Sequence, residues 1–148
     1  MDIDPAEMTL DEVRLHLAPH IADAAIFDGW SEVALIAAAE AAGVDPAVAR
    51  LAFKDSAMGM IGAWIDTIDA AMTTALPPQA LAAMKIRERI RALVQFRLDA
   101  VAGREEALRR ALAIMAMPQN VAQALKTGWR SADIMWRLAG DTATDWNR

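Results

Sequence analysis

The sequence predicts an all-α protein, and three of its features support this fold class. Of the 148 residues, 55% are hydrophobic, and alanine and methionine, which favour helices, supply much of that fraction. Few segments alternate polar and apolar residues with the period of two that half-buried strands show. Apolar residues instead recur at intervals of three and four, between Gly, Pro, Asp and Ser residues that start and stop helices. We expect residues 1–148 to form a single domain, the usual outcome at this length.

The first third of the chain has the pattern of a helix-turn-helix. We expect a first helix that is capped by Thr9 or Asp11 and ends at Phe27. A second helix is expected over residues 31–43, with Ser as its N-cap and Gly at its end. The pair Asp45-Pro46 then starts a third, short helix. Two short helices joined by such a turn are typical of DNA-reading domains.

The third helix lacks the positive charge that a DNA reader needs. Arg50 and Lys54 stand nearly alone there, and residues 1–80 hold 3 Lys and Arg against 13 Asp and Glu, a net charge of −10. Residues 81–148 hold 12 against 7, a net charge of +5. Affinity for nucleic acid comes largely from Lys and Arg on phosphates. The pattern therefore predicts a helix-turn-helix-like head, residues 8–55, that does not bind nucleic acid.

Longer amphipathic helices follow and form the expected body of the molecule, residues 56–148. The proline pair at residues 77 and 78 separates the first two. Ser131 is expected to cap the last of them. The helices are predicted at residues 56–75, 79–101, 105–118, 120–129 and 131–138.

Two of these helices, residues 56–75 and 79–101, can leave an apolar cavity between them. Methionine adapts to irregular ligands, and apolar pockets with few polar groups suit lipid tails. The same side chains can also be plain core, and the pattern does not separate the two readings. The residues expected to line a lipid pocket are Met60, Ile61, Trp64, Ile65, Ile68, Ile90 and Val94.

Other candidate sites are weaker, and composition excludes several classes. There is no cysteine, hence no disulfide, thiol nucleophile or cysteine zinc site. His16 and His20 have a zinc-ligand spacing, but no motif supplies further ligands, so no metal site is predicted. Asp66 and Asp69 are a possible acid–base pair, but no nucleophile or partner base lies nearby, so no catalytic residue is predicted. The basic side chains of residues 85–97 form either a solvated face or a contact with anionic lipid.

No apolar run is long enough to span a bilayer, because acidic residues such as Glu40 interrupt the longest ones. The acidic N-terminus is unlike a secretory signal or an Arg-rich transit peptide. These features predict a cytoplasmic protein.

Two segments carry a resemblance to known families. The segment GWSEVALIAAAEAAGVDPAVARLAFKD, residues 29–55, resembles the helix-turn-helix of TetR regulators, apart from the missing basic residues. AIMAMPQN, residues 113–120, and DIMWRLAGDTATDWN, residues 133–147, closely resemble the signature of a ubiquinone-biosynthesis accessory family, the ninth protein of the coenzyme Q series. The second resemblance extends over about residues 8–147.

This resemblance implies a TetR-like helical bundle with a degenerate helix-turn-helix, in a homodimer. It implies a non-catalytic protein without a cofactor, which binds isoprenoid quinone intermediates and presents them at the membrane to the diiron hydroxylase of the ubiquinone pathway. The partner surface carries over to Asp133, Met135 and Asp145, with Ile90 from the basic helix. The alternative is a TetR-type transcriptional regulator with a small-molecule pocket.

Family members continue into a further amphipathic helix that grips the membrane, whereas this sequence stops at Arg148. We therefore expect that helix to be absent and membrane association to be weakened. Together with the missing transit peptide, the resemblance implies a bacterial cytoplasmic protein, peripheral at the inner membrane.

Overall fold

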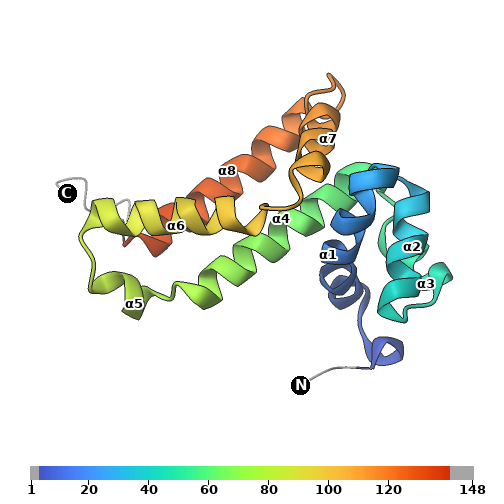
Figure 1. Cartoon of the computed structure of the whole chain (residues 1–148), viewed down its shortest axis with the longest axis horizontal. Helices are drawn as coiled ribbons and strands as arrows, with labels where there is room; N and C mark the ends of the chain where they lie inside the picture. The colour runs from blue at the N-terminus through green and yellow to red at the C-terminus, as the bar shows by residue number, and fades with distance from the viewer. Residues whose placement is uncertain (1–3, 141–148) are drawn as a thin grey trace.

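The computed structural model describes residues 4–140, and this range is helical with short connections (Figure 1). No strand occurs within it, so the all-α prediction is confirmed. A short 3-10 turn at Pro5–Glu7 precedes the helices. The helices are α1 (Leu10–Asp28), α2 (Glu32–Ala42), α3 (Pro46–Ala52), α4 (Ser56–Ala75), α5 (Pro78–Ala82), α6 (Ile86–Ala100), α7 (Glu105–Met115) and α8 (Val121–Leu138).

The caps of the first three helices explain why they begin where they do. Thr9, not Asp11, caps α1: its hydroxyl accepts from the amide of Glu12, and the Glu12 carboxylate accepts from the amide of Thr9, both at 3.2 Å. The Ser31 hydroxyl caps α2, and the Asp45 carboxylate caps α3. The two helices predicted for the helix-turn-helix are therefore present as α2 and α3.

The expected helix over residues 79–101 is interrupted, and this prediction was wrong in its continuity. The chain turns between α5 and α6, which lets Leu81 and Leu93 both point into the same buried cluster. Arg89 stabilises the turn, because its side chain donates to the carbonyl of Met84 at 2.9 Å. That guanidinium also donates to the carbonyl of Ala139 after α8, at 2.9 Å, so it is an internal link and not a surface charge.

The last helix is continuous where the sequence predicts two separate helices, at residues 120–129 and 131–138. Residues 121–138 form one continuous α8, and Ser131 lies inside it and caps nothing. The Ser131 side chain is buried and donates to a carboxylate of α4, which satisfies a hydroxyl that would otherwise favour a helix start. A tertiary hydrogen bond has thus overridden the local preference.

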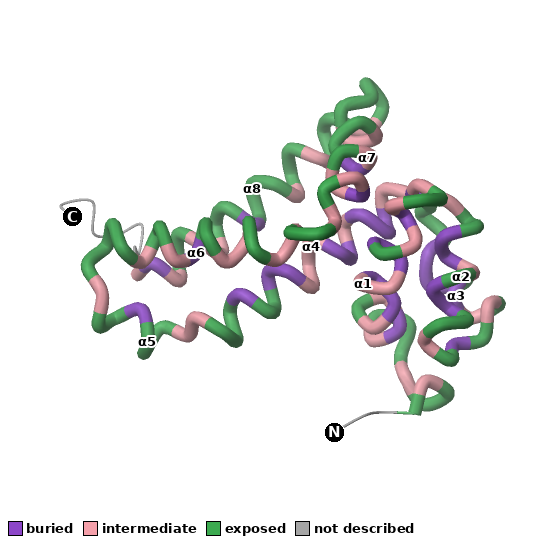
Figure 2. The backbone as a smooth tube through the Cα atoms, viewed as in Figure 1, coloured by how far each residue is buried: buried purple, intermediate pink, exposed green. Residues whose placement is uncertain are grey.

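Two buried clusters hold the fold together, and α4 runs through both (Figures 1 and 2). The larger one joins the inner faces of α1, α2 and α3 to the first part of α4 and to Ala107 and Ala111 of α7. At its centre the rings of Trp30 and Trp64 lie 5.4 Å apart, and the Trp30 indole donates to the carbonyl of Ala107 at 2.9 Å. The smaller cluster lies at the other end and contains Met72 of α4.

Candidate functional site

The outward side of α8 is apolar although it faces solvent. Leu125, Trp129, Ala132 and Trp136 recur at intervals of three and four, so they share one side of the helix; we call them the α8 stripe. Trp129 is 80% exposed and Trp136 is 52% exposed. Figure 2 shows α8 mostly in the colours of exposed and intermediate residues. Large exposed side chains gathered on one face indicate a binding surface.

Two recesses open along this stripe. The first, of about 300 Å³, is lined by Trp129, Ala132, Asp133 and Trp136. The second, of about 160 Å³, lies between α8 and α6 and adds Ile90, Leu93 and Met135 to Ala132 and Trp136. The recesses adjoin, because both are lined by Ala132 and Trp136. A small alanine between larger side chains leaves room for an apolar ligand or for an inserted side chain of a partner.

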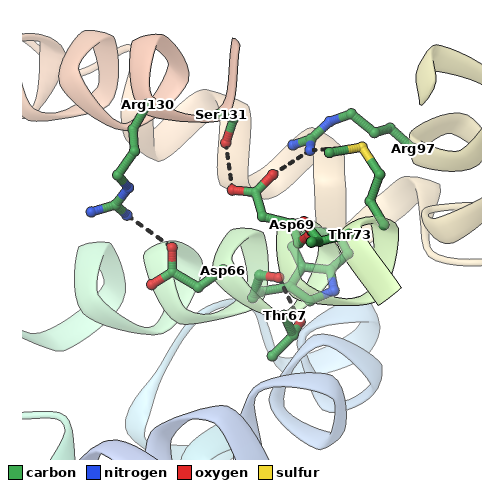
Figure 3. A network of polar contacts seen from close by, with 9 residues as sticks. Asp66, Thr67, Asp69, Thr73, Arg97, Arg130 and Ser131 are labelled. Atoms are coloured by element: carbon green, nitrogen blue, oxygen red, sulfur yellow. Dashed lines mark hydrogen bonds and ion pairs between the residues drawn. The ribbon is translucent and has the colours of Figure 1, made fainter. Parts of the chain in front are cut away.

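The inward side of α8 is held by polar contacts (Figure 3). Asp69 of α4 is 5% exposed, and its carboxylate accepts from the Ser131 hydroxyl at 2.8 Å and from the guanidinium of Arg97 of α6. One turn earlier on α4, Asp66 pairs with Arg130 of α8 at 2.8 Å. These contacts set the rotation of α8, and hence which of its sides faces outward.

The same contacts answer the question of acid–base chemistry at Asp66 and Asp69. Each carboxylate is already paired with an arginine, and within the described residues the only other hydrogen-bond partner of either side chain is the Ser131 hydroxyl. Across residues 4–140 no buried side-chain nitrogen or oxygen lacks a hydrogen-bond partner. The two aspartates therefore act as structural ties between helices.

The residues expected to line a lipid pocket lie in different parts of the structure. Ile61, Trp64 and Ile68 lie in the larger buried cluster, with Ile65 packed against it; Trp64 is 2% exposed. Met60 belongs to that cluster as well and lines an open recess of the head that also includes Phe53, away from α6.

Val94 points outward from α6 instead. Ile90, the remaining residue of that set, lines the recess between α6 and α8. The structure does not bring these seven residues to one cavity, and their role in holding lipid stays a prediction.

The residues expected to bind a partner do come together. Ile90 and Met135 share the smaller recess, and Asp133 lines the adjoining one. Asp133 is also paired with Arg137, one turn later on α8, at 3.0 Å. Asp145 lies outside the described residues. Three of the four positions thus surround two neighbouring recesses, although their binding to a partner stays a prediction.

Sequence reasoning missed the two tryptophans that dominate this surface. The signal was present, since Leu125, Trp129, Ala132 and Trp136 follow a helical period, but the expected break at Ser131 divided it between two helices. The rings of His16 and His20 lie 6.1 Å apart, and within the part of the chain that the structure describes no group of three His, Asp or Glu side chains could hold a metal ion.

The segment that carries the α8 stripe also matches a family of known proteins. Residues 121–148 match the COQ9 family. The match begins at the first residue of α8 and supports the resemblance to the ubiquinone-biosynthesis accessory family, and it implies a role in ubiquinone biosynthesis. A search of the curated proteins found no match. Within the described residues, no helix combines the length and apolar character needed to cross a bilayer.

Proposed function

We propose that this chain is a non-catalytic accessory protein of ubiquinone biosynthesis that binds isoprenoid quinone intermediates and presents them to the diiron hydroxylase of the pathway. The observation that carries the proposal is the α8 stripe with its two adjoining recesses, which lies in the segment that matches COQ9. An isoprenoid chain needs an apolar track, and the stripe offers one along more than three turns of α8.

The partner surface and the lipid surface overlap in this proposal. Ala132 and Trp136 line both recesses, so a lipid in one recess lies beside any protein that contacts the other. Aromatic side chains at the centre of an interface commonly carry most of its binding energy. Asp133 at the edge of the stripe supplies a polar contact that sets the partner's orientation.

The proposed protein acts as a homodimer at the cytoplasmic side of a bacterial inner membrane. In support, Leu112 of α7 and Leu125 of α8 are large exposed apolar side chains that line neither recess. An apolar surface larger than one cargo needs is typical of an interface between protein subunits.

The alternative of a transcriptional regulator finds little support in α3. Its one cation, Arg50, pairs with Glu32 of α2 at 2.7 Å, so the charge that would face phosphate is already partly neutralised. A regulator would bind a heparin column at neutral pH and elute with salt. We expect Arg50→Gln with Lys54→Gln, on the head, to leave retention on such a column unchanged.

The proposal is tested by mass spectrometry of an organic extract of the purified protein, together with capture of the purified hydroxylase on the immobilised chain. We expect polyprenylated quinone precursors in the extract and a captured hydroxylase. A protein that holds no isoprenoid after incubation with a prenylated quinone precursor, and that captures no hydroxylase, would contradict the proposal. Asp145→Lys serves as the sequence-derived variant, for which we expect weakened hydroxylase capture and an unchanged helical circular-dichroism spectrum.

A further inference from the structure

Helix α6 has an exposed side that nothing in the described structure covers. Four aliphatic residues follow one another at intervals of four, so they form a line along the helix, and two arginines lie directly beside that line. Leu98, at the end of the line, is 59% exposed. We call these residues the α6 face: Ile86, Arg87, Ile90, Arg91, Val94 and Leu98.

The charges of α6 are sorted between its sides. Arg89 and Arg97 point inward, to backbone carbonyls and to Asp69. Arg87 and Arg91 lie on the α6 face, are exposed, and form no ion pair within the described residues. Glu88 and Asp99 fall on another side of the helix, away from the aliphatic line. The face is therefore both apolar and cationic, over a helix about 22 Å long at 1.5 Å per residue.

We propose that the α6 face docks on the surface of an anionic bilayer, with its aliphatic side chains in the interfacial region and Arg87 and Arg91 on the lipid phosphates. Helices that lie in a membrane interface combine an apolar line with flanking Lys or Arg in this way. Lys85, exposed directly before α6, adds a third cation at the same end. The inference rests on the proposed function, since a carrier of membrane-soluble intermediates has to meet the bilayer.

Charge complementarity favours a bilayer over a second copy of this chain. A two-fold contact between two α6 faces brings the arginines of both copies together, and like charges in a closing interface are costly. A heterologous contact between the α6 face and the acidic head of another copy would generate a ring or a filament and not a two-fold dimer. An anionic bilayer pairs with both the charge and the apolar line.

The position of the face connects it to the candidate cargo site. Ile90 belongs to the α6 face and also lines the smaller recess with Trp136. A docked α6 therefore places the mouth of that recess at the level of the lipid headgroups. An isoprenoid tail can then pass from the bilayer to the α8 stripe without crossing water.

The experiment is co-sedimentation of the full chain with vesicles of phosphatidylcholine, with or without phosphatidylglycerol. We expect the chain to sediment only with the anionic vesicles, and less at high salt, where the Debye length is short. Arg87→Gln with Arg91→Gln should weaken this binding about 30-fold, because each basic residue near an anionic surface contributes a factor of about five. Arg50→Gln with Lys54→Gln, on the head, removes the same charge and should leave binding unchanged.

A second variant tests the apolar line without touching the recess. Val94→Ser with Leu98→Ser should also reduce vesicle binding, while circular dichroism stays that of the folded chain because both side chains are exposed. Binding of all α6 variants at the level of the unaltered chain would overturn the proposal. Variants of the α6 face that lose the dimer or the hydroxylase capture but keep their vesicle binding would also overturn the proposal, because either outcome assigns the α6 face to a protein partner. Failure of the unaltered chain to capture the hydroxylase in solution, where no vesicle is present, bears on the proposed function and not on the α6 face.

Discussion

The Ser131 hydroxyl of α8 lies 2.8 Å from the Asp69 carboxylate of α4 and donates a hydrogen bond to it inside the molecule. Ser131 is the buried residue of α8, whose remaining described positions are intermediate or exposed. Because Arg97 of α6 binds the same carboxylate, three helices meet at one buried charge. This junction keeps the two tryptophans of the α8 stripe on the outside.

Removing the carboxylate should therefore destabilise the protein more than removing the hydroxyl. Asp69→Ala leaves Arg97 partly buried and unpaired, a change that typically costs about 3–5 kcal/mol. Ser131→Ala removes one hydrogen bond from a charged carboxylate that keeps its arginine, and should cost about 1.5–3 kcal/mol. Urea unfolding of both variants measures the difference. Equal losses for the two variants would show that Arg97 contributes nothing to the junction.

Two glycines offer a matched test of backbone conformation. Gly29, after α1, has φ of +71° and ψ of −177°, a region that only glycine adopts readily. Gly29→Ala should lower the free energy of unfolding by about 1–3 kcal/mol, and its new methyl group also meets the Arg110 guanidinium at 3.3 Å.

Gly62 is the control for that substitution. It lies inside α4, and a methyl group added there has open space around it. Gly62→Ala should raise the free energy of unfolding by about 0.5–1 kcal/mol, because alanine favours the helix. Thermal unfolding of the two variants should therefore show shifts of opposite sign, and a stabilised Gly29→Ala protein would mean that the turn after α1 is not held as described.

The start of α7 predicts a dependence of stability on pH. The Glu105 carboxylate accepts from the amide of Gly103 at 2.8 Å, and this hydrogen bond lowers the pKa of Glu105 below its ordinary value of 4.5. Because the pKa of Glu105 is lower in the folded state than in the unfolded state, its carboxylate adds to the free energy of unfolding above pH 4.5. This contribution is lost as the pH falls through the folded-state pKa. Glu105→Gln should thus melt below the unaltered chain at neutral pH, and the gap should close in more acidic buffer. A gap that stays constant down to the most acidic buffer would contradict this role, and Glu88→Gln is the control on α6.

Much of the fold follows from local patterns, and the failures have physical causes. The caps at Thr9, Ser31 and Asp45 and the absence of strands are local properties, so the sequence predicts them. The continuity of α8 depends on Ser131, whose partner lies 62 residues away along the chain, and Arg89 ties the turn before α6 to a carbonyl 50 residues away. No window of sequence contains both members of such a pair.

The candidate site shows the same limit. The spacing of apolar residues assigns Trp64 and Trp136 equally well to a core or to a pocket, because both belong to series at intervals of three and four residues. The structure places Trp64 against Trp30 in the larger cluster and leaves Trp136 exposed. What separates them is which neighbouring helix covers each side chain, and that is a property of the tertiary structure.

The last prediction concerns the alanine that both recesses share. Ala132→Arg places a charged side chain between the two recesses, on the exposed side of α8, so it should abolish hydroxylase capture and empty the protein of co-purifying isoprenoid while the melting temperature changes by only a few degrees. Gln123→Arg adds the same side chain to α8, exposed but off the stripe, and should alter neither property. If both variants retain lipid and partner as the unaltered chain does, the α8 stripe is not the functional surface. If Ala132→Arg loses the hydroxylase but keeps its lipid, the cargo lies elsewhere, and the buried set around Trp64 becomes the place to look for it.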